Sequence, residues 1–468
     1  MATLSNVNLS FSQIQAVMGG TVPISLSEYY SGGTYANGVA GVPASGNAIK
    51  LSHFQGKSKY IALDFTAASA KMKLLGGGDS FSTVLSPGGT GTIYNAGNMY
   101  YGQLGDNYAG GTSRSDRLTV SVVPAIATRG SLGSRANGVS IVALATSRQT
   151  PGHTLALDST GAVHAWGYNT NGQIGSGDVT YCTVPTLIAG ASLSGRTVVT
   201  VAAGFNHTLA IDSTGALHAW GKNGDGQLGV GATDDKTVPT LVQVAGTSLS
   251  GRTVVAVAAG ETHTLAIDST GALHAWGANS SGQLGTGDKT GRTVPTLVQV
   301  AGTSLSGRTI VAVAAGEIHT FALDSTGAVH AWGNNGSGQL GTGDVTSRTV
   351  PTLLADTSLF GRTVVAVATG CLHTLALDST GAVHAWGGNS YGQLGTATGN
   401  TTAPVLVAVA GTSLFGRTVV AVAAGFNHTL AIDSTGAVHT WGNNSNGQLL
   451  DGTITPRSLA GATGVVLV

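Results

Sequence analysis

Charge is scarce in this chain: Asp, Glu, Lys and Arg make up 9% of its 468 residues, and the formal net charge is zero. Low charge is typical of membrane and fibre proteins. However, no apolar run approaches the roughly 20 residues of a membrane-spanning helix. Runs of Lys or Arg, which mark a nucleic-acid surface, are also missing. We therefore expect neither membrane insertion nor a nucleic-acid partner.

Cysteine is scarce as well, since Cys182 and Cys371 are the only two. They are too few and too unrelated in position for a disulfide framework, so reduced thiols are expected. The first five residues show no basic region followed by an apolar stretch, so no secretion signal is expected. The 72 glycines have no collagen period and instead indicate turns.

What the chain does have is a repeat. Residues 263–285 read HTLAIDSTGALHAWGANSSGQLG, and near-identical text begins at His153, His207, His319, His373 and His428. The steps between these histidines are 54, 56, 56, 54 and 55 residues. A seventh, atypical copy has Phe81, Tyr94 and Ala96 at the two His positions and the Trp position. A period of this size indicates similar units that bury their apolar faces against one another.

Each repeat reads as four short strands. In residues 252–307 these are 253–259, 262–267, 272–276 and 293–300, with Asp-Ser-Thr-Gly as the turn of the central hairpin. Seven four-stranded units predict an all-β fold, a seven-bladed β-propeller over residues 59–468. Residues 60–65 and 465–468 are the candidate segments for closing the ring within one blade.

The repeat resembles a known family. The pattern Gly-x-x-His-Thr-Leu-Ala-Ile/Leu-Asp, then His-Ala-Trp-Gly, then Gly-Gln-Leu-Gly is similar to that of the regulator of chromosome condensation repeat over about residues 72–468. The resemblance implies a seven-bladed propeller.

Residues 1–58 differ from the repeats. They read as short strands followed by Ser-capped helical turns that end at Gly19, Gly32 and Gly56. This segment resembles a small module of bacteriophage tail and other virion proteins. The resemblance implies an anchor to other virion proteins, with candidate residues Glu28, Tyr29, Tyr30, His53 and Phe54.

The recurrent polar residues of the repeat have structural explanations. The two histidines of each copy are expected to be buried at blade junctions without metal, and the Asp before Ser-Thr-Gly to cap a turn. The Trp series is expected to pack between blades. The Arg of each Gly-Arg-Thr is expected to form a ring of exposed charges. No cofactor, metal or catalytic residue is predicted.

Positions that vary between copies are the candidate binding sites, because loops on a rigid scaffold carry binding. One variable stretch precedes the first His and the other precedes Gly-Gln-Leu-Gly; solvated turns without function are the alternative. The candidates are Met99, Tyr100, Tyr101, Tyr168, Asn169, Phe205, Asn206, Lys222, Asp225, Glu261, Glu317, Asn334, Asn335, Tyr391, Phe426, Asn427 and Asn443.

Three classes of function fit these features. We expect a virion structural protein of a bacteriophage, located in the virion after assembly in the host cytoplasm, whose propeller serves as a fibre, decoration or host-binding element. The partner of the propeller loops would be a host surface receptor or glycan. The sequence leaves open whether the protein forms a homo-oligomer. The alternative is a guanine-nucleotide exchange factor or chromatin-binding propeller of the regulator of chromosome condensation type. A hydrolase is the third class; no catalytic constellation departs from the repeat, so no enzyme is expected.

Overall fold

The computed structural model describes residues 74–86, 92–98, 100–106, 117–122, 140–354, 358–396 and 399–466. The chain divides into two compact units, Met1–Ser69 and Ala70–Val468. All described residues belong to the second unit. The predicted virion module, its candidate anchor residues and the boundary at residue 58 therefore lie outside the described residues and stay predictions.

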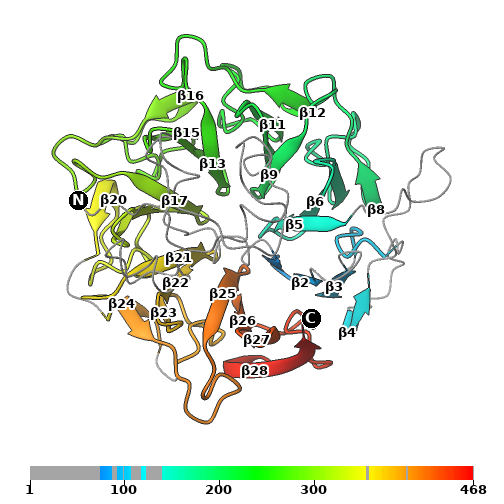
Figure 1. The fold of residues 1–468 in the computed structure, drawn as a ribbon, viewed down its shortest axis with the longest axis vertical. Helices are drawn as coiled ribbons and strands as arrows, with labels where there is room; N and C mark the ends of the chain where they lie inside the picture. The colour runs from blue at the N-terminus through cyan, green and yellow to red at the C-terminus, as the bar shows by residue number, and fades with distance from the viewer. Residues whose placement is uncertain are drawn as a thin grey trace, which may run out of the picture. The chain divides into compact units, whose positions relative to one another are not determined.

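The second unit is a ring of seven antiparallel sheets, each built from four consecutive strands (Figure 1). This confirms the predicted seven-bladed propeller. The innermost strands of blades 1 to 7, in chain order, are β1 (Leu75–Gly77), β5 (Ile141–Thr146), β9 (Val198–Ala203), β13 (Val254–Ala259), β17 (Ile310–Ala315), β21 (Val364–Thr369) and β25 (Val419–Ala424).

The second and third strands of each blade form the repeated hairpin. The second strands are β2 (Phe81–Ser86), β6 (His153–Asp158), β10 (His207–Asp212), β14 (His263–Asp268), β18 (His319–Asp324), β22 (His373–Asp378) and β26 (His428–Asp433). The third strands are β3 (Thr92–Gly97), β7 (Val163–Gly167), β11 (Leu217–Gly221), β15 (Leu273–Gly277), β19 (Val329–Gly333), β23 (Val383–Gly387) and β27 (Ala437–Gly442).

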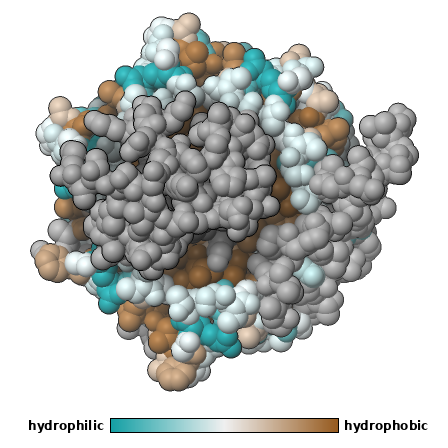
Figure 2. All heavy atoms as spheres, viewed as in Figure 1, coloured by the Kyte–Doolittle hydropathy of each residue, from teal (hydrophilic) through white to brown (hydrophobic). Residues whose placement is uncertain are grey.

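The outermost strands lie at the rim of the ring (Figure 1). They are β4 (Arg117–Val122), β8 (Cys182–Leu187), β12 (Lys236–Leu241), β16 (Arg292–Leu297), β20 (Arg348–Leu353), β24 (Thr401–Leu406) and β28 (Arg457–Val466). In the repeat analysed above, the ends of the predicted strands differ from the observed ends by no more than three residues. Both apolar and polar residues lie along the coloured part of this rim (Figure 2).

Both faces of the second and third strands are covered by neighbouring blades. Every residue of β14 and β15 is buried, including polar Thr264. The alternation of side chains along these strands therefore does not divide them into a solvent-exposed and a buried face. Instead, side chains on one face contact the preceding blade, and those on the other face contact the following blade. Small Ala residues in these strands let the sheets approach closely, as native packing density requires.

One repeated set of hydrogen bonds ties blade 2 to 3, 3 to 4, 4 to 5 and 6 to 7. Between blades 3 and 4, His207 Nε2 lies 3.0 Å from Thr264 Oγ1, and that hydroxyl donates to the Gln227 carbonyl at 2.7 Å. The Trp276 indole N–H donates to the same carbonyl at 3.0 Å. All six Trp side chains are fully buried, which confirms their predicted role in blade packing.

The ring closes between blades 7 and 1, a junction that we call the seam. Phe426 N–H donates to the Gly78 carbonyl at 3.1 Å, and His428 Nε2 lies 2.8 Å from Ser82 Oγ. Every blade consists of consecutive strands in the described residues, so no strand from one end of the chain completes a sheet at the other. Closure by a shared blade was expected and is not seen there. Residues 60–65 lie outside the described residues.

Candidate functional site

Both variable stretches lie at the same end of the blades. The turns between the first and second strands and the loops between the third and fourth strands share one end because all strands are antiparallel. Lys222 N–H donates to the Asn206 carbonyl at 2.8 Å, and Asn334 N–H to the Ile318 carbonyl at 2.9 Å, so each loop touches the turn of its own blade. We call this end of the propeller the loop face.

The opposite end, which we call the hairpin face, carries the Asp-Ser-Thr-Gly turns and the connectors between blades. Ser248 Oγ lies 2.7 Å from His274 Nδ1, and His274 Nε2 lies 3.1 Å from Asp268 Oδ2. Arg252 also contacts that carboxylate oxygen, at 2.6 Å. Burial alone would raise the pKa of Asp268. Hydrogen bonds from Thr270 and His274 nevertheless hold that pKa well below its usual range.

This Ser–His–Asp chain recurs in five blades with buried imidazoles and carboxylates, as a repeated packing contact does. The Asp side chains cap their turns, as predicted. The predicted exposure of the recurrent arginines is confirmed, and each guanidinium is in addition paired with such an Asp. These arginines are Arg196, Arg252, Arg308, Arg362 and Arg417.

On the loop face, the turn residues surround the centre of the ring. Glu261 N–H donates to the Glu317 carbonyl at 3.2 Å, and Cys371 N–H to the Phe426 carbonyl at 3.1 Å, so neighbouring turns are bonded to each other. The Phe205 and Phe426 rings, from blades 3 and 7, lie 6.3 Å apart. The turns therefore bring side chains from distant blades together.

Arg148 adds a cation to this centre. It lies in the longer turn of blade 2 and reaches blade 6, where its Nη1 donates to the Thr369 carbonyl and to Thr369 Oγ1 at 2.9 Å. Burial lowers the pKa of Arg148 to about 10, so the side chain is still charged at neutral pH. Sequence reasoning missed Arg148, because its turn is longer than the others and has no counterpart in the repeat.

Three acidic side chains, Asp79, Glu261 and Glu317, lie near Cys371 of the same centre. Burial, and then the charge of Glu317, raise the pKa of Glu261, and burial raises the pKa of Asp79. The Cys371 thiol donates to the Glu317 carboxylate, and burial together with this contact raises the thiol pKa. Asp79 was also missed, although it holds the position of Glu261 in the first repeat. We call Asp79, Arg148, Phe205, Glu261, Glu317, Cys371 and Phe426 the central cluster.

The remaining candidates divide into two groups. Asn169 and Asn335 are fully buried, and their amides bind the loop itself: Asn335 Nδ2 donates to the Asp344 carbonyl at 2.9 Å, and its Oδ1 accepts from Leu340 N–H at 2.9 Å. The others lie on the turns and loops of the loop face with at least partial exposure: Tyr100, Tyr101, Tyr168, Asn206, Lys222, Asp225, Asn334, Tyr391, Asn427 and Asn443. Met99 lies outside the described residues.

Four tyrosines of two neighbouring loops gather into one patch. Tyr100 and Tyr101 come from blade 1, and Tyr168 and Tyr181 from blade 2. Tyr181 was not predicted as a candidate; its sequence signal is that no other repeat has an aromatic residue at that position. We call these four residues the tyrosine patch.

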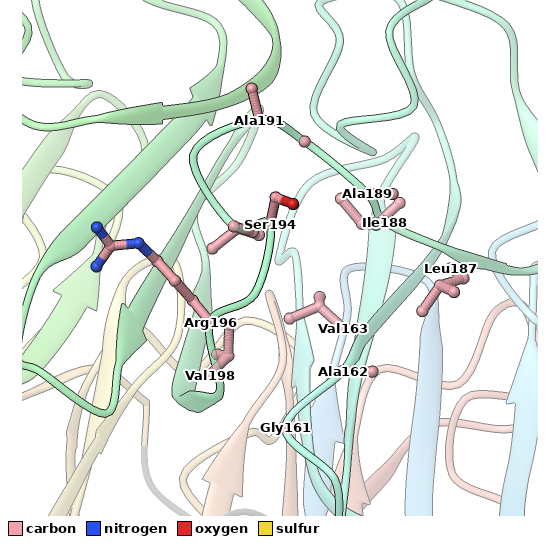
Figure 3. Close-up of a pocket in the computed structure, with 12 residues that line it drawn as sticks. Gly161, Ala162, Val163, Leu187, Ile188, Ala189, Ala191, Ser194, Arg196 and Val198 are labelled. Atoms are coloured by element: carbon pink, nitrogen blue, oxygen red, sulfur yellow. The ribbon is translucent and has the colours of Figure 1, made fainter.

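A shallow pocket of about 400 Å³ lies beside the connector from blade 2 to blade 3 (Figure 3). Its lining is mostly apolar, and the Arg196 side chain extends away from Leu187 and Ile188 in Figure 3 and pairs with Asp212. The pocket brings together no set of reactive side chains.

No group of three or more His, Cys, Asp or Glu residues in the described part of the chain is arranged to hold a metal ion. None of the described elements is a helix long and apolar enough to cross a membrane.

Comparisons with known proteins agree with this architecture. The chain is 36% identical over 228 residues to the ultraviolet-B receptor UVR8 of Arabidopsis thaliana, an alignment that covers 48% of this chain and 49% of the receptor. It is 36% identical over 223 residues to the human E3 ubiquitin-protein ligase HERC2, covering 47% of this chain and 4% of the ligase. The chain thus matches about half of the receptor and a small part of the ligase.

Solved structures show the same fold. Yeast RCC1 (Prp20), in a complex with Kap60, superposes with a TM-score of 0.65 at 22% identity, covering 85% of this chain and 87% of that one. Human WBSCR16 gives a TM-score of 0.65 at 22% identity, with 80% and 94% covered.

The family match spans residues 136–460 and is described as an RCC1-like domain. It leaves out residues 1–58, so their resemblance to virion modules, and with it the virion location, stays a prediction. The match covers well over half of the chain and agrees with the repeat pattern, the seven blades and the solved structures. The chain belongs to the RCC1-like domain family.

Proposed function

We propose that this propeller is a protein-binding module of the RCC1 type, without catalytic activity of its own, and that it receives its partner on the loop face. The observation that supports this is the distribution of variation. The hairpin face carries the same Ser–His–Asp–Arg contacts in blade after blade. The turns of the central cluster vary between blades, with Phe in blades 3 and 7, Glu in blades 4 and 5 and Cys in blade 6. A scaffold needs only the repeated contacts, so the non-repeated side chains are free to serve recognition.

The charge of the central cluster suits a partner with a basic segment. Asp79, Glu261 and Glu317 outnumber Arg148, and partial burial strengthens their interaction with an incoming cation. The partly exposed Phe426 ring, which lies beside the buried Phe205 ring, adds apolar surface. A relative with the same fold, yeast Prp20p, is described by its binding to Gsp1p and histones, and this chain would take a partner of a similar kind.

Binding of purified histones and of a small GTPase to the full chain tests this function. Glu261→Lys places a positive charge at the centre of the loop face, and we expect it to weaken binding by about tenfold or more. The matched control is Ser250→Lys, an exposed position on the hairpin face, which should leave affinity unchanged. Binding that is lost in Ser250→Lys and kept in Glu261→Lys, or no binding of either protein, would contradict the proposal.

A further inference from the structure

The tyrosine patch is held together by ring contacts around Tyr101. The Tyr101 ring centroid lies 4.7 Å from Tyr100, 5.3 Å from Tyr168 and 5.2 Å from Tyr181, each with a steep interplanar angle of 70° to 89°. Tyr168 and Tyr181 stack on each other, with centroids 5.3 Å apart and an angle of 27°. The four rings therefore form one surface across the loops of blades 1 and 2.

Packing of the propeller does not require these tyrosines. The positions equivalent to Tyr168 in blades 3 to 7 hold Lys222, Ala278, Asn334, Gly388 and Asn443. The positions equivalent to Tyr181 in blades 3 to 6 hold Asp235, Gly291, Ser347 and Asn400. These blades fold without an aromatic residue at either place, so the patch is an addition to the scaffold.

The patch is open to solvent. Tyr100 is 56% exposed and Tyr181 is 42% exposed. None of the four phenol oxygens makes a hydrogen bond to another described residue. Burial and the neighbouring phenols of Tyr181, Tyr100 and Tyr168 raise the pKa of Tyr101. An incoming molecule meets both ring surface and hydroxyl groups that can donate and accept.

A carboxylate next to the patch also departs from the repeat. In blades 4 and 5, Asp288 and Asp344 pair with Arg292 and Arg348, four residues later, at 2.6 Å. In blade 2 the equivalent aspartate is Asp178, and Cys182 replaces the arginine. Asp178 is exposed and lies three residues before Tyr181, without the ion pair that its counterparts make.

We propose that the tyrosine patch, with Asp178, is a binding site for a neutral carbohydrate. One face of a pyranose ring presents C–H groups that stack on a phenol ring, and its hydroxyl groups donate to a carboxylate and exchange hydrogen bonds with phenols. The described charged residues of the two loops, Asp106 and Asp178, are both acidic, which disfavours phosphate-bearing ligands such as nucleic acids. This site lies away from the central cluster and does not depend on the protein partner proposed above.

A proline-rich peptide is the main competing ligand, because such peptides bind grooves lined by aromatic side chains. The observed ring geometry favours the sugar. Tyr101 meets its three neighbours edge to face, so the rings fill the gaps that a peptide groove would need between them.

The test uses the full chain and a panel of neutral oligosaccharides (glucose, galactose, mannose and N-acetylglucosamine oligomers), with binding followed by saturation-transfer NMR and calorimetry. We expect at least one class to bind, and Tyr181→Ala to weaken that binding by about tenfold. Asp178→Asn should also weaken it, while Tyr391→Ala, an exposed tyrosine on blade 6, should not. Thermal melting of each variant checks that the propeller is folded.

Several outcomes would overturn the site. These are no saturation transfer from any of the oligosaccharides at millimolar concentration, or equal affinity of the wild type and a folded Tyr181→Ala variant. Tyr181-dependent binding of a proline decamer or of an oligothymidine, in the absence of sugar binding, would assign the patch to that ligand instead. Loss of histone or GTPase binding in Glu261→Lys has no bearing on these results.

Discussion

At the scale of the residue, four buried histidines share one tautomer: His153, His207, His263 and His373. Thr264 has a single hydroxyl proton, which it donates to the Gln227 carbonyl, so it accepts from His207 at Nε2. The His207 proton therefore sits on Nε2, and Nδ1 has no hydrogen-bond partner. Burial lowers the pKa of His207 to about 3. Equal values apply to His153, His263, His319, His373 and His428.

The low pKa of these histidines predicts acid sensitivity. The unfolded chain binds a proton at each such histidine below a pKa of about 6.5, whereas the folded chain does so only near pH 3. Stability is therefore complete above about pH 6.5 and is lost as the pH falls, by up to about 1.4 kcal/mol per pH unit for each histidine. Blade 1 has Phe81 at the position equivalent to His207. We expect His207→Phe to reduce the pH dependence of the unfolding free energy by the contribution of one histidine.

Denaturant unfolding at pH 7, 6 and 5 measures this slope. Thr264→Val is the matched control, since it removes the hydroxyl that accepts from His207 but keeps the titrating imidazole. It should lower stability at every pH and leave the slope unchanged. An unchanged slope in His207→Phe would show that this imidazole has the same pKa in the folded and the unfolded chain.

The tryptophans carry more stability than the exposed tyrosines. Trp276 is fully buried and donates to the Gln227 carbonyl, so Trp276→Ala should cost about 3–5 kcal/mol of unfolding free energy. Tyr391 is 45% exposed, and Tyr391→Ala should stay within about 0.5 kcal/mol of the wild type. Chemical denaturation of both variants checks this, and equal losses would contradict the assigned burial.

At the scale of the element, the seam has its own packing. In six blades the glycine that ends Gly-Gln-Leu/Ile-Gly has a positive φ and faces the Trp of the next blade. A Cβ on Gly395 would stand 2.8 Å from Trp441 Nε1. At the seam the Trp position is Ala96 and the glycine position is Leu450, which has a φ of 60°. Leu450 and Ala96 pack in one buried cluster, so the leucine fills the volume that the indole leaves.

A double-mutant cycle tests this exchange. Leu450→Gly relieves the left-handed backbone but opens a cavity, with a net cost of about 2 kcal/mol or more. Ala96→Trp alone should be overpacked against Leu450. The pair Leu450→Gly with Ala96→Trp restores the arrangement of the other junctions, and we expect it to be more stable than the sum of the single changes by about 1–3 kcal/mol. Additive losses in denaturant unfolding would contradict the exchange.

The repeat determined most of what could be predicted. Strands, turns and blade number follow from spacing, because each blade repeats the same local chemistry. The mode of ring closure, the central cluster and the tyrosine patch could not be predicted from repeat spacing. In the central cluster Arg148 bonds to Thr369, 221 residues away, and the tyrosine patch joins the loops of two blades. Asn169 and Asn335 were predicted as binding residues because the residues beside them vary between copies. The asparagine itself is present in every copy from blade 2 to blade 7, and the buried amides of Asn169 and Asn335 bind the loop.

At the scale of the whole molecule, the propeller forms a compact unit of its own, Ala70–Val468. Deleting residues 1–57 should therefore leave a soluble protein with a single cooperative thermal transition. Calorimetry checks this, and an aggregated or non-cooperative product would show that the first residues are needed for folding. Incorporation of the same deletion into virus particles, measured by mass spectrometry, tests the predicted attachment role separately.

The seam also bears on how such a chain arises. Each described sheet is complete within one stretch of sequence, so duplication or loss of a single gene segment adds or removes a whole blade without leaving a strand unpaired. Only the residues at the two flanks of the closing junction must then change to fit each other. Leu450 and Ala96 are such a fitted pair. The near-identity of the internal blades, together with the divergence of the first, is what growth by copying in the middle of the chain would produce.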